Sequence, residues 1–242
     1  MLSYLLSPLM HLYHLLVFCF CHIAIVVAYA LFGHRGRLKV IAAYYALMQF
    51  GLYIVGCSIT VKGRENLAPK GRPLIVASNH QSLYDIPALG HIFASRDIEF
   101  VAKSSLGKGI PTVSFNLRKG YSALIDRDKG GQSVRAIFTL GKYMEESQIA
   151  VGVFPEGTRS RSGEVQPFMP AGIGTLLRSS PSALVQPFAI KGHAQLIAQS
   201  AAFLKVGQRI EYSILPIIDP KGMKLDELTA LLQSEIEKAL KD

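Results

Sequence analysis

The first 57 residues are strongly apolar, and this segment constrains the fold more than any other. Leu15 to Phe32 is an apolar stretch interrupted only by His22, and Val40 to Cys57 forms a second one. Between them lies a short basic segment, GHRGRLK, at residues 33–39. The first stretch approaches the length that crosses a bilayer. We therefore expect residues 1–57 to form a hydrophobic helical membrane anchor, and residues 58–242 to form the main domain.

The distribution of charge indicates how this anchor sits in a membrane. Residues 1–61 contain three Lys or Arg and no Asp or Glu, whereas the remainder has 23 basic and 17 acidic residues. If both stretches crossed the bilayer, two basic regions would lie on opposite sides, which the positive-inside rule disfavours. Either the first stretch spans and the second lies flat, or both enter one leaflet as a helical hairpin. Both arrangements predict a main domain facing the cytoplasm, at the inner membrane if the source is bacterial. Two buried helices of a soluble protein are the alternative.

The net charge of +9 has more than one interpretation. Attraction to anionic lipid explains it. Nucleic-acid binding is not expected, because no Arg-rich or aromatic-interleaved patch appears. His11, His14 and His22 fall on one helix face, but no further partner has metal-site spacing. We therefore expect no metal and no cofactor, and place these histidines at the membrane interface.

The rest of the chain alternates short apolar runs with helical patterns, which is typical of an α/β domain. Helices are expected at residues 86–93, 131–146 and 225–240. The sequence thus predicts a mixed, largely parallel sheet flanked by helices. The expected strands are Ser58–Lys62, Leu74–Ser78, Ile98–Ala102, Ala123–Ile125, Ile149–Phe154, Leu184–Ile190 and Arg209–Ile217.

The stretch Asn79 to Asp85 lies between a predicted buried strand and a predicted helix, where side chains converge on ligands. His80 and Asp85 are five residues apart, so they meet only if the chain turns between them. A carboxylate on one imidazole nitrogen fixes the tautomer and leaves the other nitrogen as a base. With no obvious Ser or Cys nucleophile motif, the pattern predicts a base that deprotonates a substrate hydroxyl. A capping Asn with an incidental His and Asp is the alternative.

Three further stretches lie within or at the ends of predicted strands. Ile125-Asp126-Arg127 ends one strand, Phe154 to Ser160 reads FPEGTRS, and Val185-Gln186-Pro187 belongs to another. Pro and Gly on either side of Glu156 indicate a tight turn, and Arg suits bidentate phosphate recognition. A single Arg is more often part of a surface salt bridge. Four motifs at the strand ends of one sheet together predict a phosphate site.

These motifs resemble those of the glycerolipid acyltransferase family, specifically the 1-acylglycerol-3-phosphate acyltransferases. Asn79-His80 with Asp85 is similar to the family block N-H-x-x-x-x-D, and Phe154 to Ser160 matches a second block in full. Ile125-Asp126-Arg127 and Pro187 resemble two less specific blocks. The resemblance extends from about Val61 to Lys191.

The resemblance implies direct acyl transfer, without an acyl-enzyme, from acyl-CoA or acyl-carrier protein to the sn-2 hydroxyl of lysophosphatidic acid at a membrane surface. The product would be phosphatidic acid. His80 would be the base and Asp85 would orient it. A different acceptor (glycerol 3-phosphate, a lysophospholipid or an amino-acid lipid) and a non-catalytic lipid-binding protein are the alternatives. The implied substrate-binding residues are Asn79, Lys103, Arg127, Glu156, Gly157, Thr158, Arg159 and Pro187.

The sequence departs from the family pattern in three places. The second block is one residue longer than expected around Tyr121-Ser122-Ala123. Gln186 and Phe188 replace the usual small or β-branched neighbours of Pro187, and Met169 stands near a position that is often basic. Phosphate contacts at Met169 are therefore not expected.

Overall fold

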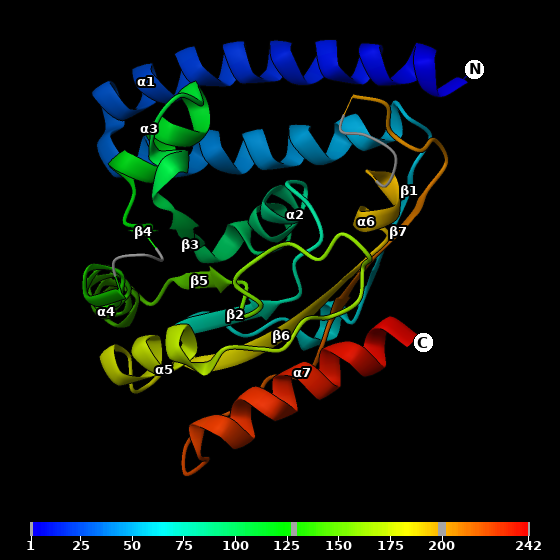
Figure 1. The fold of residues 1–242 in the computed structure, drawn as a ribbon. Coiled ribbons are helices and arrows are strands. Elements are labelled where there is room, and N and C mark those ends of the chain that lie inside the picture. The colour runs from blue at the N-terminus through cyan, green and yellow to red at the C-terminus, as the bar shows by residue number, and fades with distance from the viewer. Residues whose placement is uncertain (1, 127–129, 198–201, 242) are drawn as a thin grey trace.

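The computed structural model describes residues 2–126, 130–197 and 202–241. Within these ranges the chain forms a seven-stranded sheet in the order β1-β7-β6-β2-β5-β3-β4 (Figure 1). Neighbouring strands are parallel except β6 and β7, which are antiparallel. The predicted α/β fold with a mixed, largely parallel sheet is confirmed. The strands are β1 Ser58–Lys62, β2 Leu74–Ser78, β3 Glu99–Lys103, β4 Ala123–Ile125, β5 Ala150–Val153, β6 Leu184–Lys191 and β7 Arg209–Ile214.

Helices cover both faces of the sheet, as buried parallel strands require. Along β2, Leu74 and Val76 belong to one hydrophobic core, while Ile75 and Ala77 belong to the core on the other face. The first core includes α1 and α2, and the second includes α4, α5 and α7. The helices are α1 Leu2–Phe50, α2 Asp85–Ile92, α3 Pro111–Lys119, α4 Gly130–Ser147, α5 Pro170–Ser179, α6 His193–Leu196 and α7 Leu225–Lys241.

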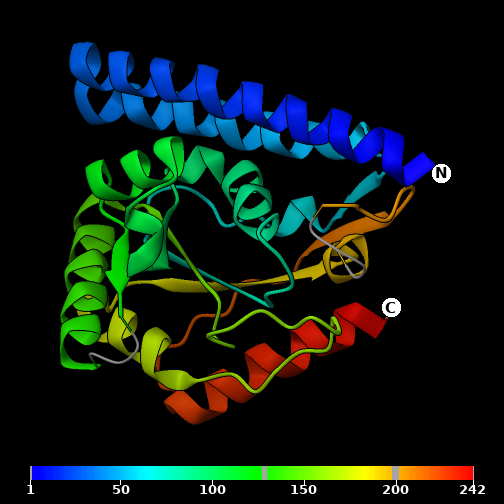
Figure 2. The same ribbon diagram turned by 45° about the horizontal axis from the view of Figure 1, so that its top comes forward.

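Helix α1 is folded back on itself at Gly33, which has φ 58° and ψ −142°. A positive φ of this kind favours glycine. Figures 1 and 2 show the two arms lying side by side and antiparallel above the rest of the molecule. The Tyr13 hydroxyl on the first arm donates to the Leu47 carbonyl on the second, over 3.1 Å. Gly36 allows the close approach, because a Cβ there would lie 2.2 Å from the Ala28 carbonyl oxygen. The two apolar stretches therefore form a helical hairpin.

The second arm of this hairpin is anchored to the sheet by a buried ion pair. The Arg37 guanidinium contacts the Glu99 carboxylate at the start of β3 and the Asn116 side-chain oxygen in α3. The Arg37 and Glu99 side chains are each only 1% exposed. Ser122 donates a further hydrogen bond to Glu99 Oε2 over 2.5 Å. The basic segment at the hairpin bend is thus part of the folded domain.

The first arm presents an apolar stripe to the outside. Residues 2–53 are the one segment within the described ranges that is long and apolar enough to cross a membrane by length and composition. The stripe follows helical spacing of three or four residues, and each member is at least half exposed. Its opposite side packs on the second arm. The stripe residues are Leu5, Leu9, Leu12, Leu16, Phe20, Ile23, Val27 and Leu31.

Two of the anchor histidines, His11 and His14, contact backbone carbonyls. The His11 ring reaches the Ala202 carbonyl at 3.0 Å, and the His14 ring reaches the Met48 carbonyl at 3.2 Å. The His14 contact joins the two arms, because Met48 lies on the second arm.

Candidate active site

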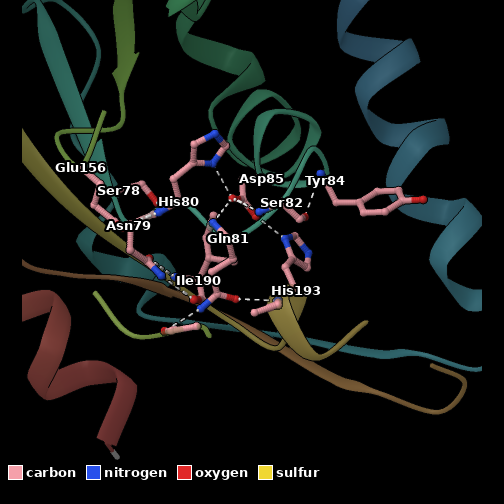
Figure 3. Close-up of polar contacts among 12 residues, drawn as sticks. Ser78, Asn79, His80, Gln81, Ser82, Tyr84, Asp85, Glu156, Ile190 and His193 are labelled. Atoms are coloured by element: carbon pink, nitrogen blue, oxygen red, sulfur yellow. Dashed lines mark hydrogen bonds and ion pairs between the residues drawn. The ribbon is translucent and has the colours of Figure 1, made fainter. Parts of the chain in front are cut away.

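The site is built at the carboxyl end of β2, where the strand leads through a short turn into α2. The turn brings together the two residues of the predicted pair. His80 Nδ1 donates to Asp85 Oδ2 over 2.7 Å (Figure 3). The other ring nitrogen of His80 points away from Asp85 in this view, and the side chain is 16% exposed. A histidine held in this way has its free nitrogen available to accept a proton.

Asp85 is fully buried and is held by several donors. Its Oδ2 also accepts the backbone N–H groups of Gln81, at 2.6 Å, and Ser82, at 2.8 Å. Because Asp85 begins α2, the positive end of the helix dipole adds to this stabilisation. Burial alone raises the pKa of the carboxyl, but hydrogen bonds from His193 and His80 outweigh burial and lower the pKa to about 2. Asp85 is therefore an anion throughout the physiological pH range.

The loop after β5 holds His80 from the other side. The Phe154 ring stacks on the imidazole, with centroids 4.0 Å apart and planes 18° apart. The His80 N–H donates to Glu156 Oε1 over 2.7 Å, and the His80 carbonyl accepts the Ser160 N–H over 2.8 Å. The main chain of His80 is thus fixed by the loop that carries the FPEGTRS block.

In this structure the Glu156 carboxylate accepts hydrogen bonds from main-chain N–H groups. Its second carboxyl oxygen accepts the Gln166 N–H at 3.2 Å, so the carboxylate joins the His80 segment to the end of its own loop. Burial raises the pKa of Glu156 to about 7. Gly157 follows with φ 67°, and its N–H donates to the Phe154 carbonyl to close a tight turn. The turn that the flanking Pro and Gly predict is present.

The other predicted residues occupy different parts of this edge. Asn79 exchanges two hydrogen bonds with the Ile190 backbone, at 2.9 and 2.8 Å, which fixes β2 beside β6. Thr158 and Arg159 are exposed next to Ser160, and Lys103 is exposed at the end of β3. Pro187 pairs with Ala77 inside the sheet, before the edge is reached. Arg127 lies outside the described residues.

His193 is part of this constellation, and the sequence analysis did not identify it. It begins α6, two residues after β6 ends, and is fully buried. Its Nδ1 lies 2.5 Å from Asp85 Oδ1, so Asp85 stands between two histidines (Figure 3). The strand-end rule that identified His80 also applies here, because β6 is parallel to β2 and ends at the same edge.

The arrangement has the groups that a general base requires. His80 carries a nitrogen free of Asp85, the buried carboxylate is placed where it can stabilise an imidazolium, and exposed cationic side chains lie on the same edge of the sheet. Such a site suits removal of a proton from a hydroxyl that attacks an electrophilic carbonyl.

Comparisons with known proteins show which family the chain resembles. A family model described as Acyltransferase matches residues 58–191. The 1-acyl-sn-glycerol-3-phosphate acyltransferase alpha of Mus musculus is 22% identical over 188 residues, covering 78% of this chain and 64% of that protein. The 1-acyl-sn-glycerol-3-phosphate acyltransferase of Borreliella burgdorferi is 28% identical over 200 residues, covering 81% and 76%. The chain thus spans less than two thirds of the length of the mouse relative.

A solved structure is similar over nearly the whole chain. It is the crystal structure of the 1-acyl-sn-glycerophosphate acyltransferase of Thermotoga maritima, with a TM-score of 0.78 and 25% sequence identity. The similarity covers 99% of this chain and 96% of that one, so it includes the N-terminal hairpin. Because the family model covers residues 58–191, more than half of the chain, the protein belongs to the acyltransferase family, as its motifs predict.

Proposed function

We propose that the protein transfers a fatty acyl group from acyl-CoA or acyl-carrier protein to the sn-2 hydroxyl of 1-acylglycerol 3-phosphate. The product is phosphatidic acid, an intermediate of phospholipid biosynthesis. The observation that carries the proposal is the His80–Asp85 pair at 2.7 Å, with the second imidazole nitrogen left free. The printed names of the relatives from Mus musculus and Borreliella burgdorferi support the choice of acceptor.

The proposed reaction proceeds in two steps. The free nitrogen of His80 takes the proton of the acceptor hydroxyl while the oxygen attacks the thioester carbonyl carbon, giving a tetrahedral oxyanion. The intermediate collapses as the carbon–sulfur bond breaks, and the departing thiolate takes the proton from His80. The ester and the free thiol are the products, and His80 returns to its starting state. The buried Asp85 carboxylate stabilises the imidazolium between the two steps.

The acceptor's phosphate is assigned to the loop after β5. Arg159 is exposed there and precedes Ser160, whose N–H donates to the His80 carbonyl. A guanidinium on this loop therefore lies close in sequence to the point where the loop contacts the base. Arg presents paired donors that suit a phosphate dianion. Thr158 and Lys103 supply further donors on the same sheet edge, and Arg127 is a fourth candidate.

We further propose that the hairpin lies in one leaflet, with the main domain on the cytoplasmic side. Two observations favour this over a single span: the second arm is tied to β3 through Arg37, and the outward stripe of the first arm is apolar along its length. A helix perpendicular to the bilayer would pull the attached domain into the membrane. External protease on intact cells should leave residues 63–241 uncut, and cleavage there would reverse the orientation.

The activity is tested with purified full-length protein in mixed micelles. We expect phosphatidic acid to form from 1-acylglycerol 3-phosphate and a long-chain acyl donor, with acyl-CoA and acyl-carrier protein compared in parallel. Glycerol 3-phosphate, lysophospholipids lacking a free phosphate and an amino-acid lipid are the competing acceptors. Faster acylation of any of these would replace the proposed acceptor, and no transfer to any of them would refute catalysis.

The phosphate assignment has its own test. Arg159→Lys keeps the charge but loses the bidentate geometry, so we expect a higher KM for the acceptor and little change in KM for the donor. The loss is about 1.5–3 kcal/mol, the range for hydrogen bonds to charged groups. Arg161→Lys, at another exposed position of the same loop, is the matched control. An effect of Arg159→Lys on the donor alone would assign this arginine to the thioester carrier.

A further inference from the structure

A chain of buried hydrogen bonds runs from Asp85 away from His80. His193 Nδ1 lies 2.5 Å from Asp85 Oδ1, and His193 Nε2 lies 2.9 Å from the Tyr212 hydroxyl. That hydroxyl lies 2.5 Å from Gln49 Oε1 on the second arm of the hairpin. Gln49 Nε2 in turn donates to the Tyr84 carbonyl over 3.3 Å. Four segments that are distant in sequence thus meet behind the Asp85 carboxylate.

The donor and acceptor of each hydrogen bond in this network follow from the two groups at its ends, the Tyr84 carbonyl and the Asp85 carboxylate. The Tyr84 carbonyl only accepts, so the amide nitrogen of Gln49 must face it, and Gln49 Oε1 must face Tyr212. The single proton of the Tyr212 hydroxyl is therefore donated to Gln49. His193 Nε2 must then be the donor to the Tyr212 oxygen. At its other end the Asp85 carboxylate also only accepts, so His193 Nδ1 is a donor as well.

The titratable groups that surround His193 are consistent with this result. Tyr84, Tyr212 and Cys57 face the network, and burial raises the pKa of each, to about 12 for Tyr84. These three groups are therefore neutral at physiological pH. Tyr53 lies beside Tyr212, and His80 lies on the far side of Asp85. The carboxylate of Asp85 is the anion that His193 contacts directly.

We propose that His193 is a permanent imidazolium, protonated on both ring nitrogens, that neutralises Asp85 and positions it for His80. This role deepens the proposed function and rests on it. A lone carboxylate would favour protonation of His80 before the substrate arrives. With the charge of Asp85 balanced by His193, less net negative charge faces the His80 ring. Asp85 still accepts the His80 N–H and fixes the tautomer.

Two variants remove the positive charge by different means. His193→Asn places an amide N–H toward Asp85 Oδ1 and carries no charge. Tyr212→Phe leaves His193 in place but removes the acceptor of its Nε2–H, so the neutral tautomer becomes the favoured one. Tyr45→Phe is the matched control, because Tyr45 is also buried but packs on Gly90 and Phe100.

The kinetic readout is the pH profile of kcat/KM. The acid limb is the part of the profile where kcat/KM falls as the pH decreases. In both variants this limb should lie at a pH about one unit higher than in the wild type, as expected when a neighbouring unit positive charge is removed. The plateau at high pH should stay within about tenfold of the wild type, and Tyr45→Phe should leave the limb in place. An acid limb that does not move in either variant would refute the proposal, because a merely structural role lowers the rate at every pH.

The protonation state is also tested without any substrate. In the full-length protein labelled with ¹⁵N-histidine, His193 should show two protonated ring nitrogens at pH 7–8, and His193→Asn identifies these signals by their loss. A bare ring nitrogen on His193 at this pH would overturn the proposal even if the enzyme is active. If the proposed acyl transfer fails while both nitrogens are protonated, the proposed function is wrong and the buried imidazolium stands.

Discussion

Replacing Asp85 by Asn removes the charge at the centre of the site and leaves its shape unchanged. The introduced amide can keep its oxygen toward the donors of His80, Gln81 and Ser82, and turn its NH₂ toward His193. His193 can then lose a proton and accept that hydrogen bond. We therefore expect the variant to fold, with a lower stability and a much lower activity.

The loss of stability follows from the pKa of Asp85. It falls from the ordinary value of 3.8 to about 2, which corresponds to about 2.5 kcal/mol at about 1.4 kcal/mol per pKa unit. Because the folded-state pKa is the lower one, this stability is present above the unfolded-state pKa and is lost as the pH falls from about 4 to about 2. The expected decrease in melting temperature at pH 7 is about 5–10 °C for a chain of this size.

The assay compares thermal unfolding of the wild type and Asp85→Asn in the same detergent at pH 7 and pH 3. The difference in melting temperature should be large at pH 7 and clearly smaller at pH 3. We also expect kcat to fall on the order of 10²–10⁴, because a neutral amide no longer stabilises the imidazolium that forms on His80. An equal difference at both pH values would show that lost packing is responsible, and would refute the linkage argument.

Three further predictions concern other contacts of the site and hairpin. His80→Ala should lower turnover on the order of 10²–10⁴ or more with the fold intact, and near-normal turnover would exclude it as the base. Glu156→Gln should become more stable relative to the wild type between pH 5 and pH 8, because the raised pKa of Glu156 means that its ionisation destabilises the fold as pH rises through about 7. A relative melting temperature independent of pH would contradict this. Arg37→Met should cost about 3–5 kcal/mol by leaving Glu99 buried without its cation, and the additional change Glu99→Leu should restore much of this in the same unfolding assay.

Much of the sheet was predictable because its strands are short runs rich in apolar and β-branched residues, and β2 and β5 are buried along their whole length. The predicted β1, β2 and β4 match the structure, and β7 ends three residues earlier than expected, at Ile214. Helix α3 was not identified because its buried face carries Thr112, Ser114 and Asn116, which removes the apolar period. Helix α5 contains Gly172 and Gly174, which weaken its helical pattern.

The candidate site was predictable only where its members are close in sequence. The five-residue spacing of His80 and Asp85 indicates a turn, and the turn is present. His193 lies 108 positions from Asp85, so only the folded chain brings them together. The structure also gives a role to Gln186, one of the positions that departs from the family pattern. Its buried amide accepts the Ala68 N–H and donates to the Asn66 and Leu215 carbonyls. This side chain hydrogen-bonds to main-chain groups beside β6, so its role is structural.

The hairpin and the sheet share one hydrophobic core, and this limits how the protein can be truncated. Tyr44, Tyr45 and Met48 of the second arm lie in the same core as Leu89 and Phe93. Deleting residues 1–57 to obtain a soluble fragment would expose that core. It would also leave Glu99 without its cation and the Tyr212 hydroxyl without Gln49. A truncated fragment would therefore aggregate, and solubility is better sought by replacing the outward leucines of the first arm with polar residues.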